Sequence, residues 1–218
     1  MTSLTPSVQQ VPNPLTDNGL AHMVAALMQS RQTILPRRLG GRSPDAQQLA
    51  MILEAAATAP DHGQLRPWRF VLVPQEARAR LADVFGVSLV ERDATCTPEQ
   101  MAKACEKAYR APLLMLVIVD GSHSDAGVDL VERIISLGCA VQNMLLMTTA
   151  LGYGSALTSG KALKSPGLRW LFGLTDDEQA VCFLNIGTVQ LSKSPRVRPV
   201  PGDYVSTLSP GGTLEPGF

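Results

Sequence analysis

The distribution of apolar and polar positions along the chain predicts three buried strands. They are a compact β-like run at 68–73, a continuous apolar run at 112–119 and a second apolar run at 180–189. Short runs rich in Val, Ile, Leu and Phe are typical of strands that lie inside a core. We therefore expect these three segments to form the centre of a sheet.

Helical periodicity, with apolar residues three and four positions apart, occupies most of the chain outside these strands. The predicted helices are one ending near Arg31, one within 42–60 that starts at Ser43 and Pro44, one around 75–86, one that starts at Thr97 and Pro98, and a short one that starts at Ser165 and Pro166. Ser or Thr followed by Pro is a typical helix start. The segment "SALTSGKAL" at 155–163 is predicted to be a polar loop.

The longest predicted helix runs from Val128 to Leu151 and has no charged residue after Arg133. Apolar side chains therefore point in every direction around its axis, and such a helix has to be covered on all sides. The chain's own sheet can provide this cover, and so can an identical subunit. The pattern alone leaves both alternatives open.

The order of the elements favours an α+β fold, because helices and strands follow one another without strict β-α-β alternation. A chain of 218 residues with 45% hydrophobic content suits one domain, which we place at 18–218. Residues 1–17, rich in Pro, Thr, Ser, Gln and Asn, are predicted to be a flexible N-terminal extension. Pro, Gly and Ser are abundant near the C-terminus, where we expect an extended arm that wraps over a surface.

Charge and hydropathy argue against nucleic acid and membrane partners. Nineteen basic and nineteen acidic residues give a formal net charge of zero, which supplies no long-range field toward polyanions. The longest clean apolar run, at 111–119, is far shorter than the roughly 20 residues of a membrane helix. The N-terminus lacks the features of a secretory signal or a transit peptide, so a cytoplasmic location is expected by default.

Motifs for common hydrolase, metal and nucleotide sites are absent from the sequence. It contains no Walker loop, GxGxxG, HExxH or GxSxG motif. The four cysteines form no CxxC pair, and Cys139 and Cys182 lie in apolar sequence, where we interpret them as small buried hydrophobes. With three histidines in the chain, we expect no metal site.

Basic residues at three separated places are candidates for binding a small anion. They are Arg31 at the end of the first helix, Arg66 and Arg69 in the turn "APDHGQLRPWRF" at 59–70, and Arg196 and Arg198 in the tail. Each one taken alone is equally compatible with a solvated surface charge, because arginine is mostly exposed. In the same turn, His62 beside Asp61 is compatible with a local hydrogen-bonding role.

Four segments of the chain share the motifs of a known family. They are "SRQT" at 30–33, "ILEAAATAPDHGQLRPWRFVLV" at 52–73, "GCAVQNMLLMTTALGYGSALTSG" at 138–160 and "FLNIGTVQ" at 183–190. In this order they resemble the FMN-dependent nitroreductase family, and most closely its small bacterial branch. The resemblance implies a central, mostly antiparallel sheet flanked by helices in an α/β/α sandwich. It also implies an intertwined homodimer with FMN in clefts at the subunit boundary.

The resemblance further implies several cofactor-binding residues and no catalytic side chain. They are Arg31, Gln32 and Thr33 at the FMN phosphate and ribityl chain, Thr58 and His62 reaching the flavin of the other subunit, Leu157, Thr158 and Ser159 along the flavin, and Arg196 and Arg198 as second basic contacts to the phosphate. Two departures stand out. "RQT" replaces the family's "RRS", which removes one positive charge, and "LTS" at 157–159 replaces an aromatic-plus-arginine sequence.

The activity that the resemblance implies is that of an NAD(P)H-dependent FMN oxidoreductase. Electrons from NADH or NADPH would pass through FMN to a nitroaromatic, a quinone or a related small-molecule acceptor in ping-pong order. Two alternatives remain: a non-catalytic protein that binds or stores FMN, and a cofactor-free structural dimer. Yellow protein that does not oxidise NAD(P)H would favour the first, and colourless protein that gains no thermal stability from FMN would favour the second.

Overall fold

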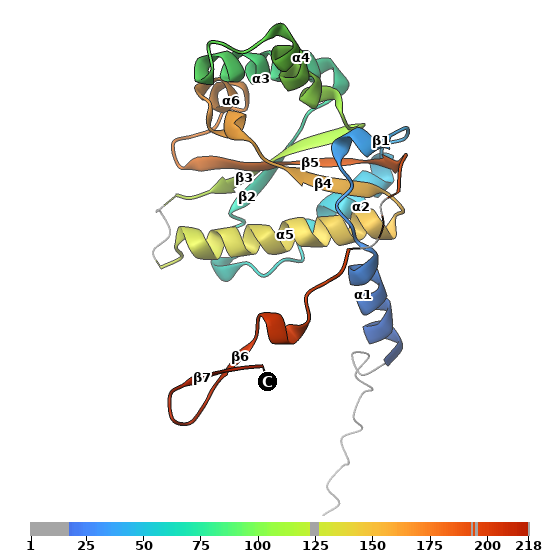
Figure 1. Ribbon diagram of the computed structural model, residues 1–218, viewed down its shortest axis with the longest axis vertical. Coiled ribbons are helices and arrows are strands. Elements are labelled where there is room, and N and C mark those ends of the chain that lie inside the picture. Colours follow the sequence, from blue (N-terminus) through green and yellow to red (C-terminus); the bar gives the residue numbers. More distant parts are fainter. Residues whose placement is uncertain (1–17, 123–126, 193, 195, 218) are drawn as a thin grey trace, which may run out of the picture.

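The computed structural model describes residues 18–122, 127–192, 194 and 196–217, and its centre is a five-stranded sheet (Figure 1). The strands are β1 Leu39–Gly40, β2 Trp68–Leu72, β3 Leu113–Asp120, β4 Gly154–Thr158 and β5 Glu178–Val189. Each neighbouring pair is antiparallel, in the order β1-β5-β3-β2, and β4 also pairs with β5. The three strands predicted from apolar runs correspond to β2, β3 and β5.

Strand β3 is buried on both faces, as its continuous apolar sequence predicts. Successive side chains of a strand point to opposite sides of the sheet. The side chains divide into Met115, Val117 and Val119 in one core and Leu114, Leu116 and Ile118 in the other. None of these six is more than 3% exposed, so the two cores are separated by β3 itself.

Helices cover both faces of the sheet and complete the expected α/β/α sandwich (Figure 1). One layer contains α2 Ala46–Ala56 and α5 Leu130–Ala150, and the other contains α3 Arg78–Arg92, α4 Pro98–Glu106 and α6 Pro166–Leu171. Ile52 and Met144 fill the core under α2 and α5, whereas Leu81 and Leu168 fill the core under α3 and α6. The predicted α+β fold is confirmed.

Helix starts follow the predicted chemistry in two of three cases. Thr97 caps α4 and Ser165 caps α6, each accepting a backbone hydrogen bond. The predicted start of α2 at Ser43 is wrong, because Asp45 is the cap. Its carboxylate accepts from the backbone N of Gln48 at 2.8 Å, and the Gln48 side chain accepts from the backbone N of Asp45 at 3.1 Å. This reciprocal arrangement satisfies two backbone donors at once.

The prediction of a polar loop at 155–163 is wrong for its first half, which belongs to β4. This strand pairs with β5 from Gly154 opposite Gly187 to Thr158 opposite Phe183. Gly154 permits the close approach, since a Cβ added there would lie 2.6 Å from a methyl carbon of Val189. The small side chains of β4 therefore suit a strand whose neighbouring side chains lie very close to its backbone.

Helix α5 is covered on one side only by its own chain. One side of α5 packs in the core through Leu137, Ala140, Val141, Met144 and Leu145. On the other side, Val131, Ile134 and Ile135 are 64%, 47% and 60% exposed. By length and composition α5 is long enough to cross a membrane. Its packing against the sheet instead makes it a core helix with one apolar face that this chain leaves uncovered.

The two ends of the described chain project from the same side of the sheet (Figure 1). Helix α1 Asn18–Ser30 is exposed along most of its length, including Met23 at 69%. The C-terminal arm ends in a hairpin of β6 Ser206–Leu208 and β7 Leu214–Pro216. The arm extends away from the sheet and its helices, so the expectation that it wraps over a surface is not met within this chain (Figure 1). The predicted extension at 1–17 lies outside the described residues.

The two cysteines predicted to be buried differ from one another. Cys182 on β5 is 8% exposed, and this burial raises the pKa of its thiol to about 11. Cys139 on α5 is only half-buried, so the prediction that it is a buried residue is wrong. The reason is that α5 has one uncovered side, which an apolar sequence does not reveal.

Candidate functional site

Two arginines from opposite ends of the chain meet just beyond α1. A guanidinium nitrogen of Arg198 donates a hydrogen bond to the backbone oxygen of Arg31 at 2.9 Å. Partial burial, and then the positive charge of Arg198, lower the pKa of Arg31. Within the described ranges no carboxylate forms an ion pair with either side chain. The pair is an uncompensated positive site, which suits an anion such as phosphate.

The residues that follow Arg31 are attached to the beginning of β4. Thr33 forms a parallel bridge with Ser155, and the backbone N of Ile34 donates to the backbone oxygen of Ser155 at 2.9 Å. Gln32 lies between the arginine and this bridge and is half-buried. The segment with the candidate phosphate-binding residues is thereby fixed to the edge of the sheet.

The other end of β4 carries Leu157 and Thr158, and Ser159 follows the strand. Leu157 is 43% exposed, and Thr158 accepts a hydrogen bond from the side-chain nitrogen of Asn185 at 3.0 Å. Since a strand rises about 3.3 Å per residue, Ser159 lies roughly 13 Å along the chain from Ser155. One short strand therefore connects the arginine pair to the candidate flavin loop.

Asn185 is a supporting residue that the motif-based interpretation missed. It is 2% exposed and also donates to the backbone oxygen of Ala156 at 3.3 Å. A buried polar side chain has to be hydrogen-bonded, and these bonds hold the end of β4 in place. The signal available in the sequence was a single amide inside the apolar run "FLNIG".

The turn at 59–70 is held in an unusual backbone conformation. Gly63, Gln64 and Arg66 have positive φ angles of 70°, 54° and 47°. For the last two residues this costs on the order of 1–3 kcal/mol each, and Arg66 also precedes a proline, which disfavours helical-region geometry. The Asp61 carboxylate stabilises the turn by accepting from the backbone N of Arg66 at 2.8 Å. Strain of this kind is concentrated at functional sites, which supports a functional role for the turn.

Thr58 and His62 lie along α5. The Thr58 hydroxyl accepts from the side-chain nitrogen of Asn143 at 2.9 Å. Nδ1 of His62 lies 2.7 Å from a carboxylate oxygen of Glu132, and the imidazole is 67% exposed. The Glu132 contact sets the orientation of the imidazole without burying it.

The structure brings together some of the candidate residues and not others. Arg31, Thr33 and Arg198 cluster at the start of β4, which follows the C-terminal end of α5. His62 instead pairs with a residue in the first turn of α5, and a helix of 21 residues is about 30 Å long. In the described part of the chain no hydrogen bond links Thr58 or His62 to that cluster.

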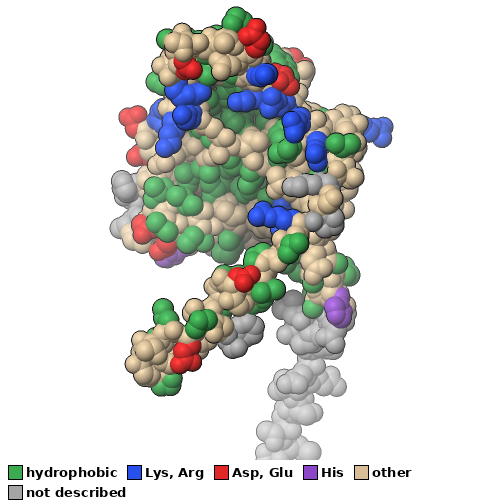
Figure 2. Space-filling view, viewed as in Figure 1, with side chains coloured by type: hydrophobic (Ala, Val, Ile, Leu, Met, Phe, Trp, Pro, Cys, Tyr) green, Lys and Arg blue, Asp and Glu red, His purple; other side chains and the backbone are tan. Residues whose placement is uncertain are grey.

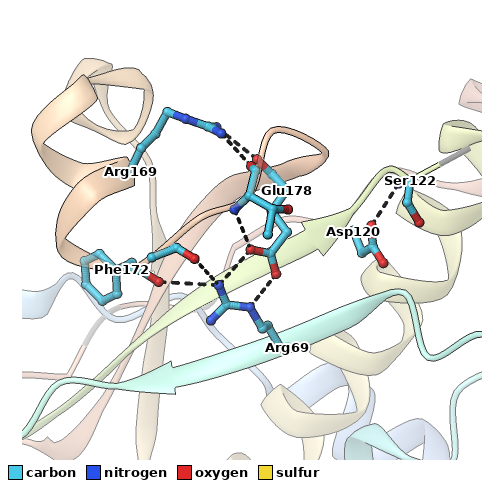
Figure 3. A network of polar contacts seen from close by, with 8 residues as sticks. Arg69, Asp120, Ser122, Arg169, Phe172 and Glu178 are labelled. Atoms are coloured by element: carbon cyan, nitrogen blue, oxygen red, sulfur yellow. Dashed lines mark hydrogen bonds and ion pairs between the residues drawn. The ribbon is translucent and has the colours of Figure 1, made fainter.

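Arg69 does not contribute to an anion site, because Glu178 binds it (Figure 3). The Arg69 guanidinium makes two hydrogen bonds with the Glu178 carboxylate, one of them at 2.8 Å, and this pairing raises the pKa of Arg69 and lowers that of Glu178. Arg169 donates to the backbone oxygen of Glu178 at 3.0 Å (Figure 3). The group of three joins β2, α6 and β5 and is structural.

The remaining two basic candidates lie in exposed positions. The Arg66 side chain is exposed, and its backbone N donates the hydrogen bond to Asp61 that stabilises the turn. Arg196 is exposed in the arm two residues before Arg198. Of the five arginines considered from the sequence, the structure therefore places Arg31 and Arg198 in contact.

Comparison with known sequences agrees with this fold. The chain matches the sequence model of the Nitroreductase family over residues 28–188. It is 33% identical over 170 residues to "Putative NAD(P)H nitroreductase YdjA" of Escherichia coli K12, covering 78% of this chain and 91% of that protein. It is also 33% identical over 152 residues to "Putative NAD(P)H nitroreductase" of Haemophilus influenzae, covering 70% and 82%.

Solved structures show the same fold. A nitroreductase-like family protein from Bacillus cereus superposes with a TM-score of 0.68 at 20% identity, covering 94% of this chain and 97% of that one. Oxidised iodotyrosine deiodinase, crystallised with FMN and 3-iodo-L-tyrosine, gives a TM-score of 0.61 at 23% identity, covering 82% and 97%.

The match to the family model and to the two relatives places this protein in the flavin oxidoreductase class. More specifically, this chain belongs to the nitroreductase family.

Proposed function

We propose that this protein is an NAD(P)H-dependent FMN oxidoreductase that acts as a homodimer on nitroaromatic, quinone or related acceptors. The observation that carries the proposal is the Arg31–Arg198 pair at one end of β4 with the exposed face of Leu157 at the other. One end suits a phosphate and the other suits a planar ring.

The arginine pair fits the phosphate of FMN on electrostatic grounds. A phosphate monoester carries about −1.5 to −2 charges at neutral pH, which would offset the repulsion between the two guanidinium groups. Each guanidinium offers a planar fork of donors that matches phosphate oxygens. Gln32 and Thr33 follow directly and supply amide and hydroxyl groups for the ribityl chain, and Arg196 lies near enough in sequence to add a further positive charge.

The end of β4 fits the ring. Leu157 provides apolar surface, and Thr158 is fixed by Asn185, so the strand presents a rigid edge. Ser159 follows the last residue pair of β4 and adds a hydroxyl beside this surface. Largely preformed, mostly apolar surfaces with a few polar groups are typical of cofactor sites.

A second subunit would complete the site. The uncovered apolar face of α5, the exposed helix α1 and the exposed arm together leave Met23, Ile135, Val197 and Tyr204 at 60% exposure or more. Apolar patches of this kind mark association surfaces, and most homo-oligomers are two-fold symmetric dimers. A partner bound there would bring its own Thr58 and His62 toward the flavin, which explains why one chain keeps them apart from Arg31.

A bound FMN would supply the redox chemistry that connects NADH or NADPH to the acceptor in ping-pong order. The side chains of this protein bind and orient. Arg31 and Arg198 hold the phosphate, and His62, positioned by Glu132, is a hydrogen-bonding group for the ring of the partner's flavin. A cytoplasmic location stays a prediction from the sequence.

A visible absorption spectrum of the purified protein, followed by anaerobic addition of NADPH or NADH, tests the proposal. We expect flavin bands that bleach with the nicotinamide and return when a nitroaromatic or a quinone is added. Bands that do not bleach would indicate an FMN-binding or storage protein. Colourless protein whose thermal stability does not rise with FMN would indicate a cofactor-free dimer.

A further inference from the structure

A basic pocket lies between the sheet and the layer formed by α3 and α4. Its volume is about 750 Å³, which is within the range of small-molecule sites. Its walls come from the end of α3, one face of α4, the segment after β4 and the facing side of the sheet. The motif segments at 138–160 and 183–190 contribute part of its lining, whereas the basic residues of α3 and α4 belong to none of the motifs that point to the flavin.

Positive side chains surround the pocket out of proportion to the chain's composition. The described residues that line it include five bases and one acid, although the whole chain has nineteen of each. The bases are Arg92, Lys103, Lys107, Arg110 and Lys161, and the acid is Asp93. Figure 2 shows Lys and Arg side chains gathered over the upper part of the molecule, where the helices of this layer lie.

Most of this charge has no ion-pair partner among the residues that the structure describes. Arg110 pairs with Glu106 at 3.1 Å, four residues away on an exposed surface. In the described residues, Lys103, Lys107 and Lys161 form no ion pair, and all three are exposed. Gln100 and Lys103 lie on the side of α4 that lines the pocket, and Lys107 follows at helical spacing just after its end, at the start of the short 3₁₀ helix Lys107–Tyr109.

The floor of the pocket is apolar and includes Phe85, Leu89, Leu114 and Phe183. A cationic rim over an apolar floor suits an anion with an organic body. The cations come from the end of α3, from α4, from the 3₁₀ helix Lys107–Tyr109 with Arg110 after it, and from the 3₁₀ helix Lys161–Lys164, so they are distributed around the opening. A distributed set matches a ligand with several phosphates better than one with a single carboxylate.

The pocket adjoins the candidate flavin site, because Thr158 and Ser159 line both. We infer that the pocket binds the phosphates of the dinucleotide donor and that it favours NADPH over NADH. The inference rests on the proposed function for its biological meaning. Its physical basis is that the additional phosphate of NADPH brings about −1.5 to −2 further charges to a site with unpaired lysines.

Calorimetric titration with adenosine 2′,5′-bisphosphate and with ADP tests the pocket without turnover. On the purified protein we expect the 2′,5′-bisphosphate to bind about tenfold or more tightly than ADP, as charge-assisted hydrogen bonds provide. In the double variant Lys103→Gln, Lys107→Gln this difference should disappear. Lys164→Gln is the matched control, because Lys164 is exposed on the same short helix as Lys161 and does not line the pocket.

Steady-state kinetics provide the second arm. The ratio of kcat/KM for NADPH to that for NADH should exceed one, and it should fall about tenfold in the double variant and stay unchanged in the control. Equal binding of the two nucleotides, or an unchanged ratio in the double variant, overturns the inference. A rise in KM for a nitrobenzoate acceptor with unchanged NADPH kinetics also overturns it and assigns the pocket to an anionic acceptor.

The two arms separate this inference from the proposed function. If the protein retains no flavin and does not oxidise NADPH, the proposed function fails, whereas the calorimetric preference still reports on the pocket. If the flavin bleaches equally well with both donors and neither nucleotide is preferred, the pocket inference fails and the proposed function stands.

Discussion

Replacing Ile135 by alanine should weaken the proposed homodimer and leave the subunit folded. Ile135 is 60% exposed on the uncovered face of α5, between Val131, which is 64% exposed, and Gly138. A Cβ added to Gly138 would meet no atom within 4 Å. The face therefore has room for the side chains of another helix. Because the side chain contributes little to its own core, truncating it should affect association first.

The magnitude follows from the exposed area. Full burial of an isoleucine side chain stabilises by about 1.5–3 kcal/mol, so burying the 60% that is exposed here is worth about 1–2 kcal/mol. Alanine keeps part of this, which leaves a loss of about 1 kcal/mol per copy. A two-fold interface contains the residue twice, so the dimer loses about 2 kcal/mol, or roughly thirtyfold in Kd.

Sedimentation equilibrium over a range of protein concentrations measures this Kd, and circular dichroism confirms that the variant is folded. Trp170→Ala is the control, because Trp170 is 83% exposed on α6 in the opposite helix layer. An unchanged Kd for the Ile135 variant, or an equal loss for the Trp170 variant, would show that α5 is not the interface. A substitution at Leu145, on the same helix, would not test the interface, because Leu145 is 7% exposed and belongs to the core of the chain itself.

Three further predictions concern the fold. Hydrogen bonds from Arg69 lower the pKa of Glu178, so the ion pair adds to the free energy of unfolding above pH 4.5, the ordinary pKa of the group, and this contribution is lost as the pH falls further. Urea unfolding of Glu178→Gln should therefore show a smaller loss of stability in acid than the wild type. Gly154→Ala forces a Cβ to 2.6 Å from Val189 and should cost about 1–3 kcal/mol in the same assay. Cys182, with its pKa raised to about 11 by burial, should react with iodoacetamide only after unfolding.

The sheet core was predictable because burial on two faces leaves a continuous apolar run. β3 has this pattern without interruption, and β5 has it over most of its length. The α4 and α6 caps were predictable for a local reason, since the Thr97 and Ser165 hydroxyls bond to backbone groups within three residues. Such features depend on neighbours in sequence.

β4 was missed because its strand character comes from contacts far away in sequence. Gly154 has low strand propensity, and Ser155 and Ala156 have small side chains; they form a strand because the backbone of β5 pairs with them. How much of α5 the chain itself covers was left open for a similar reason. A helix without charges looks the same in sequence whether its own sheet or another subunit covers it.

The candidate site was predictable from motifs in part. Arg31 and Arg198 are 167 residues apart, and their contact could be anticipated from the family resemblance but not from spacing. The neutralisation of Arg69 by Glu178, 109 residues away, could not be anticipated at all. The basic pocket was missed because its lysines and arginines come from separate elements, and the four-residue spacing of Lys103 and Lys107 is common on solvated helices.

The FMN affinity of Arg31→Ala, measured by quenching of flavin fluorescence on titration into apoprotein, tests the central claim most directly. The substitution removes the guanidinium but keeps the backbone oxygen to which Arg198 donates. A hydrogen bond to a charged group is worth about 1.5–3 kcal/mol, so we predict that FMN binds roughly 10- to 150-fold more weakly. Arg80→Ala, an exposed arginine of α3, should leave the affinity unchanged. Equal FMN affinity of Arg31→Ala and the wild type would contradict the account.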